Sequence, residues 1–130
     1  MLAPALIIAS SAIVLLLGTL HLIYTFASDK FQPRDPALAE RMTRQTSLWR
    51  AWVGFNASHS LGAMLFGLVY GYLAWLHPAL LLEARGLLLI GLGFLASLWV
   101  LAIRYWFRIP LVGISLALVL FAAACGLLLV

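Results

Sequence analysis

The stretch from Trp49 to Gly62 reads W-R-A-W-V-G-F-N-A-S-H-S-L-G, and it places an asparagine, two serines and a histidine within five residues of a long apolar run. Polar and ionisable side chains are costly in lipid, so they mark either contacts between helices or a functional site. Aromatic residues begin this run, and Tyr70, Tyr72 and Trp75 lie near its end, as in helices anchored at two membrane interfaces. The stretch therefore predicts a membrane-spanning helix over residues 49–76 that carries a polar cluster.

The whole chain is more apolar than a soluble domain. Its 130 residues are 65% hydrophobic and 9% charged, with a mean hydropathy of +1.11, whereas a soluble domain is about half apolar and about a quarter charged. A run of about 20 apolar residues spans a bilayer as a helix. We therefore predict an all-α, polytopic membrane protein, with one domain over residues 1–130 that forms an up-down bundle of four transmembrane helices, at about 5–27, 49–76, 86–107 and 111–130.

The connection between the first two spans holds most of the charged residues. Asp35-Pro36 is a good helix start, because aspartate caps a helix N-terminus and proline suits its first position. The apolar residues that follow have helical spacing, with charges on the other faces. The sequence therefore predicts a short amphipathic helix at the membrane surface over residues 36–48, with a plain solvated loop as the alternative.

Basic residues are distributed unevenly between the two sides of the predicted bundle. Seven of the eight Lys and Arg residues lie on the side of the first connection and of the turn between the third and fourth spans, and only Arg85 lies opposite. By the positive-inside rule the basic side faces the cytoplasm, so both termini are expected on the outer face. The net charge of +4 then reflects orientation and contact with membrane lipids. Nucleic acid is not expected as a partner, because aromatic and basic residues do not alternate as they do on nucleic-acid surfaces.

Several polar side chains fall at a similar depth. His21 lies seven residues before Ser28 and Asn56 seven residues after Trp49, which is about 10 Å in each case at the helical rise. His59 is three residues beyond Asn56, so the two side chains share a helix face. The sequence therefore predicts a polar pocket in the cytoplasmic half of the bundle. The candidate ligand-binding residues are His21, Thr25, Asn56, His59, Ser60, Arg104 and Tyr105.

Small residues recur every four positions in the second span, at Ala63, Gly67 and Gly71. This spacing lets two helices approach closely in lipid. His59 lies one turn earlier on the same line, so the helix that packs on these small residues is expected to pass close to the imidazole. The stripe, or alternatively the fourth span, is the expected contact if the chain forms a homo-oligomer or is an accessory subunit of a larger membrane complex.

The residue types in the predicted pocket favour ligand binding. Histidine and asparagine can hydrogen-bond a carbonyl, and Arg104 can hold an anionic head, so the pocket suits a lipophilic or amphipathic molecule of the quinone or lipid class. All four carboxylates lie outside the predicted membrane spans, which leaves no acid–base pair within the membrane. No catalytic residue is therefore assigned, and the sequence leaves open whether the chain is an enzyme.

Two other interpretations of the cluster stay open. His21 and His59 could face each other across two helices and ligate the iron of a haem cofactor. The cluster could instead be structural, since a histidine or asparagine in a spanning helix often only links helices through a hydrogen bond. A zinc or copper site is not expected, because no cysteine or carboxylate joins the two histidines.

The motif W-R-A-W-x-G-F-N-x-S-H-S-x-G is accompanied by a histidine in the first span and by Y-W-F-R at the end of the third. In this combination the chain resembles a family of small, functionally uncharacterised bacterial membrane proteins with four helices. The resemblance covers nearly the whole chain. It implies a four-helix integral membrane fold in the bacterial cytoplasmic (inner) membrane, and it implies no particular activity.

Overall fold

The computed structural model describes residues 2–28 and 46–129, which form helices throughout most of their length. Four of these helices are long: α1 (Leu2–Ala27), α2 (Leu48–Leu76), α4 (Arg85–Tyr105) and α5 (Arg108–Leu129). Each is long and apolar enough to cross a membrane. The predicted all-α class and the four candidate spans are therefore confirmed, with helix ends within three residues of the predicted ones. Residues 36–45 of the predicted surface helix lie outside the described residues.

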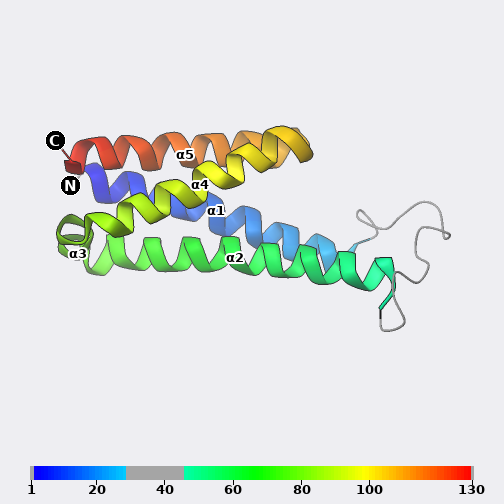
Figure 1. Ribbon diagram of the computed structural model, residues 1–130. Coiled ribbons are helices and arrows are strands. Elements are labelled where there is room, and N and C mark those ends of the chain that lie inside the picture. The colour runs from blue at the N-terminus through cyan, green and yellow to red at the C-terminus, as the bar shows by residue number, and fades with distance from the viewer. Residues whose placement is uncertain (1, 29–45, 130) are drawn as a thin grey trace.

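Helix α1 has the central position in the arrangement. It packs along α2 on one side and along α5 on another, and α4 packs on α5 (Figure 1). Both termini lie at one end of the molecule, together with the short helix α3 (Pro78–Glu83). We call this the terminal end. The opposite end holds the start of α2 and the connection between α4 and α5, and we call it the junction end (Figure 1).

Two glycines let α1 and α2 lie in backbone contact. A Cβ atom on Gly67 would lie 2.7 Å from the carbonyl oxygen of Ser11, and one on Gly18 would lie 2.9 Å from that of Ser60. Neither position can hold a side chain without separating the helices, because a backbone oxygen cannot move aside as a flexible side chain can. The two contacts fix the register of α1 against α2. This register determines which residues of the two helices meet between Gly18 and the junction end.

The other helices are held by apolar packing and by a few hydrogen bonds between helices. The Ser10 hydroxyl of α1 donates to the Ala117 carbonyl of α5 over 2.8 Å. Rings fill the space between α2 and α4, where Phe66 stacks on Phe94 with centroids 5.1 Å apart. Nearby, the Tyr70 hydroxyl donates to the Leu87 carbonyl over 2.6 Å. These contacts join α2 to α4 in the middle of the molecule and toward the terminal end.

The connections around α4 differ from the predicted ones. Residues 77–85, left between the second and third predicted spans, contain α3 with Pro78 at its first position. The fourth span was predicted to begin after Pro110, at residue 111, but Pro110 lies inside the first turn of α5 and the break falls at Trp106 and Phe107. Both prolines occupy first turns, where the backbone N–H groups have no partner within the helix and a missing N–H costs nothing.

Candidate functional site

Asn56 is the central link between α1 and α2 at the junction end. Its side-chain Nδ2 donates to the Trp52 carbonyl of the preceding turn over 2.8 Å, which turns Oδ1 toward α1. His21 Nε2 lies 2.8 Å from this Oδ1. Because an amide oxygen only accepts, Nε2 must carry the proton and donate. The amide thus fixes both the orientation of the His21 ring and the nitrogen that holds its proton.

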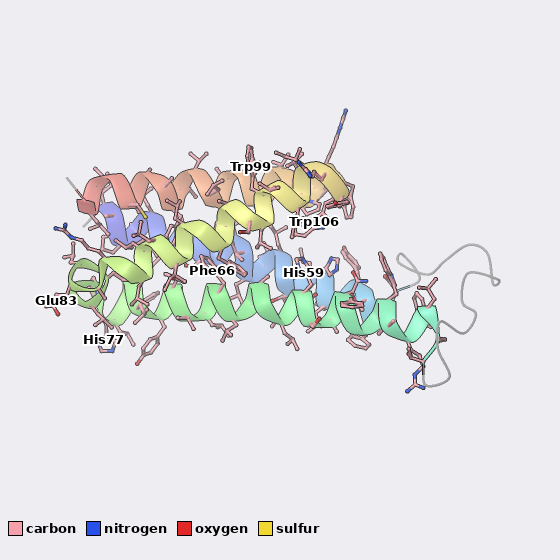
Figure 2. All side chains as sticks on the ribbon, in the orientation of Figure 1. His59, Phe66, His77, Glu83, Trp99 and Trp106 are labelled. Atoms are coloured by element: carbon pink, nitrogen blue, oxygen red, sulfur yellow. The ribbon has the colours of Figure 1, made fainter. Side chains whose placement is uncertain are left out.

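His59 lies between two other aromatic rings. Its centroid is 5.6 Å from that of His21, with the rings at 84°, and 4.8 Å from that of Trp106, with the rings at 71°. Both contacts have edge-to-face geometry, which aromatic rings favour. Figure 2 shows His59 and Trp106 toward the junction end, far from His77 at the other end of α2. We call His21, Asn56, His59 and Trp106 the histidine cluster.

The ring nitrogens of His59 distinguish this residue from its neighbours. His59 is half-buried, and within the described part of the chain neither nitrogen has a hydrogen-bond partner. A neutral imidazole offers one donor and one acceptor, and in an apolar environment each gains free energy from a partner. His59 is therefore placed to bind a polar group that enters from outside the cluster.

Thr25 and Ser60 are buried close to the cluster, but their hydroxyls are already used. Thr25 Oγ1 donates to the His21 carbonyl and Ser60 Oγ donates to the Asn56 carbonyl, each over 2.8 Å and one turn back in the same helix. Such bonds satisfy a hydroxyl inside an apolar environment without needing another helix. Among the described residues, these two side chains support the backbone beneath His21 and Asn56 and do not reach His59.

Arg104 and Tyr105 end α4 at the same end of the molecule, but the structure does not join them to the cluster. Both are exposed, Tyr105 by 74%. No hydrogen bond or ring contact links either of them to His21, Asn56 or His59 within residues 2–28 and 46–129. The next residue, Trp106, turns inward instead and covers His59.

The small residues of α2 pack within the chain. A Cβ on Gly67 would meet the backbone and side chain of α1, and Ala63 is buried against Gly18 of the same helix. Gly71 is less confined, since a Cβ there would meet only Ser11 Cβ at 3.5 Å. Helix α1, which packs on this stripe at Ala63 and Gly67, also carries His21.

The geometry also bears on metal and haem binding. Within the described residues, no three His, Cys, Asp or Glu side chains gather where they could hold a metal ion. A bis-histidine haem site needs a nitrogen of each ring directed at one iron. Nε2 of His21 is directed at Asn56 instead. In the observed position the His21 ring therefore links α1 to α2 by a hydrogen bond and does not direct this nitrogen at an iron.

Trp106 is the cluster residue that the list of candidate site residues did not include. It ends α4 within an aromatic and basic run, Y-W-F-R, whose members all suit a membrane interface. Helical periodicity stops at the end of a helix, so spacing could not tell which ring of the run turns inward. The useful signal is the break itself, because Trp106 caps α4 in an extended conformation.

Comparisons of the chain with protein-family models, with curated proteins and with solved structures found no match. The family resemblance carried by the W-R-A-W-x-G-F-N-x-S-H-S-x-G motif therefore stays a prediction. The function proposed below depends on the geometry of the histidine cluster.

Proposed function

We propose that this chain is a membrane protein whose histidine cluster binds a lipophilic molecule with a neutral polar head, of the quinone class. A head with a carbonyl group would accept a hydrogen bond from His59, while its apolar part stays among the surrounding helices or lipids. The observation that carries the proposal is the imidazole of His59, half-buried and in contact with two rings, whose nitrogens have no partner within the described residues.

A neutral head is favoured over an anionic lipid head by the residues that make up the cluster. None of the four carries a permanent charge, and Arg104, the candidate for binding an anionic head, is exposed and makes no hydrogen bond with them within the described residues. A purely structural role is supported best for Asn56 and His21, which bond to each other. It does not account for His59, which contributes only ring contacts to the link between helices.

The proposal includes an orientation in the membrane. The four long helices would form an up-down bundle in the bacterial cytoplasmic (inner) membrane, with both termini on the outer face. The exposed Arg50, Arg104 and Arg108 lie at or near the junction end, as the positive-inside rule requires for a cytoplasmic side. The cluster would then lie in the cytoplasmic half, where a lipophile can enter from the inner leaflet.

The test is the retention of small molecules by the purified protein. Wild-type protein, His59→Ala and the matched control His77→Ala are extracted with organic solvent, and the extracts are compared by mass spectrometry. His77 is a suitable control because it is exposed and lies at the other end of α2 (Figure 2). We expect one lipophile in the wild type and in His77→Ala, and its loss from His59→Ala, with all three proteins folded.

Two other results would each favour a different function. If His59→Ala keeps the same molecules but unfolds more easily than His77→Ala, the cluster is structural. If the purified wild type shows a haem absorption spectrum that His21→Ala and His59→Ala both lose, the two histidines ligate iron and the quinone proposal is wrong.

A further inference from the structure

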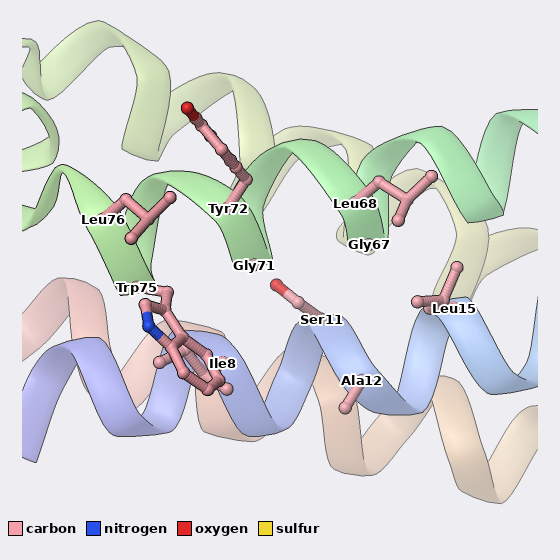
Figure 3. Close-up of a pocket in the computed structure, with 10 residues that line it drawn as sticks. All are labelled: Ile8, Ser11, Ala12, Leu15, Gly67, Leu68, Gly71, Tyr72, Trp75 and Leu76. Atoms are coloured by element: carbon pink, nitrogen blue, oxygen red, sulfur yellow. The ribbon is translucent and has the colours of Figure 1, made fainter.

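A groove of about 390 Å³ runs along the outer side of the α1–α2 pair, away from α4 and α5 (Figure 3). Its floor consists of small residues: Ser11 and Ala12 of α1 with Gly67 and Gly71 of α2. Larger apolar side chains form its sides, and Trp75 lies toward the terminal end. The groove is separate from the histidine cluster, which lies beyond the close contact at Gly18.

Ser11 sets this groove apart from other lipid-facing surfaces. It is 2% exposed, and its hydroxyl is the buried side-chain polar atom without a hydrogen-bond partner among the described residues. Every other Ser or Thr hydroxyl within the described helices donates to a carbonyl, as Ser60 and Ser97 do. Figure 3 shows the Ser11 hydroxyl pointing across the floor toward Gly71.

The depth of Ser11 decides which kind of partner could satisfy it. It lies nine residues from the start of α1, or about 14 Å along the helix, and so deep in the hydrocarbon region. A lipid chain at that depth has no acceptor, and an unsatisfied hydroxyl there is costly. The neighbouring Ser10 hydroxyl has such a partner within this chain, because it donates to the backbone carbonyl of Ala117 in the closely packed helix α5.

We propose that the groove is the docking site for α4 of a second copy of this chain. Helix α4 has an exposed face of small residues at Gly93 and Ser97, and a Cβ on Gly93 would meet nothing within 4 Å. Phe94 stacks on Phe66, so Gly93 and Gly67 lie at the same depth. Two copies with the same orientation in one membrane therefore bring Gly93 of one to the groove of the other.

Docked in this way, the second copy satisfies the hydroxyl of Ser11. Gly93 has no side chain to cover the carbonyls of the turn before it, and its own carbonyl already accepts from Ser97. A carbonyl of that preceding turn therefore accepts from Ser11, as Ala117 accepts from Ser10. The groove and the exposed face of α4 lie on different sides of the chain, so the contact is heterologous. Repetition of such a contact gives a ring if it closes and a row if it does not.

Cysteine cross-linking in the membrane tests the contact directly. In a Cys125→Ser background, Ala12→Cys and Gly93→Cys are placed in two differently tagged copies that are expressed together. We expect oxidation to cross-link this pair. Leu116→Cys replaces Gly93→Cys in the control, because Leu116 is exposed on α5 next to Ala117 and so lies at the depth of Ser10. Cross-linking no stronger than in the control would overturn the proposal, as would preferential linking of Ala12→Cys to itself.

A second experiment fills the groove with a larger side chain at a position where the fold can accept one. Gly71→Leu extends from a position where the Cβ makes only ordinary contact with Ser11, and Gly62→Leu is the control at an open position of the same helix. Self-association is measured by energy transfer between labelled copies in detergent. We expect it to weaken about tenfold in Gly71→Leu and about three- to twentyfold in Ser11→Ala, with Gly62→Leu unchanged. Unchanged self-association in Gly71→Leu would show that the groove holds lipid or nothing specific.

Discussion

At the scale of single residues, Asn56 has the clearest energetic role, because both ends of its amide are bonded. Replacing it with leucine keeps the volume but leaves the His21 Nε2–H without its acceptor. We expect Asn56→Leu to lower the free energy of unfolding in detergent by about 1–2 kcal/mol. Ser58→Ala is the control, since the Ser58 hydroxyl is exposed and donates to Phe55 of its own helix. Equal stability of the two variants would contradict the role of Asn56.

The proximity of His21, Asn56 and His59 could be predicted from the sequence, but the ring contact of Trp106 with His59 could not. Helical rise is regular, so counting residues from the span ends placed the three side chains at similar depth. The small residues of α2 lie in line with His59 and indicated that the helix packed on them would pass near the imidazole. Arg104 and Trp106 lie at the end of α4. Trp106 is extended there, so helical spacing does not predict which side chain of this end faces the cluster.

At the scale of helices, Gly67 and Gly71 provide a matched pair of substitutions in α2. A Cβ on Gly67 would lie 2.7 Å from a backbone oxygen of α1, whereas one on Gly71 makes an ordinary contact at 3.5 Å. We expect Gly67→Ala to destabilise the protein by about 1–3 kcal/mol, as overpacking does. Gly71→Ala should be neutral or slightly stabilising, because alanine favours helix more than glycine. The check is unfolding by denaturant in detergent, and similar losses in both variants would contradict the observed α1–α2 register.

The spans themselves could be predicted well, because length and hydropathy determine where a chain can cross a bilayer. Their connections could not, and proline shows the reason. Pro110 was left in the connection before the fourth span, yet a first turn of a helix accepts proline as readily as a loop does. Pro78 likewise begins α3 in the connection between the second and third predicted spans. Which of the two conformations proline takes depends on the packing of the neighbouring helices, and the local sequence does not contain that information.

At the scale of the whole molecule, the arrangement makes a prediction about topology. Both termini lie at the terminal end, and the histidine cluster lies toward the opposite end (Figures 1 and 2). Because the described Arg50, Arg104 and Arg108 lie at or near the junction end, a reporter enzyme that works only outside the cytoplasm should be active when fused to either terminus. The control is a reporter that works only in the cytoplasm, which should be active when inserted in the connection between α1 and α2. The opposite pattern would place the cluster in the outer half of the membrane.

The most direct test of the central claim is the dissociation constant of a short-tailed 1,4-benzoquinone, measured by calorimetry on purified protein in detergent. If His59 binds a carbonyl head, wild type and His77→Ala should bind the quinone with equal affinity. His59→Ala should bind about tenfold or more weakly, because the hydrogen bond to the head is lost. Equal binding by His59→Ala and wild type, with all three proteins folded, would contradict the account.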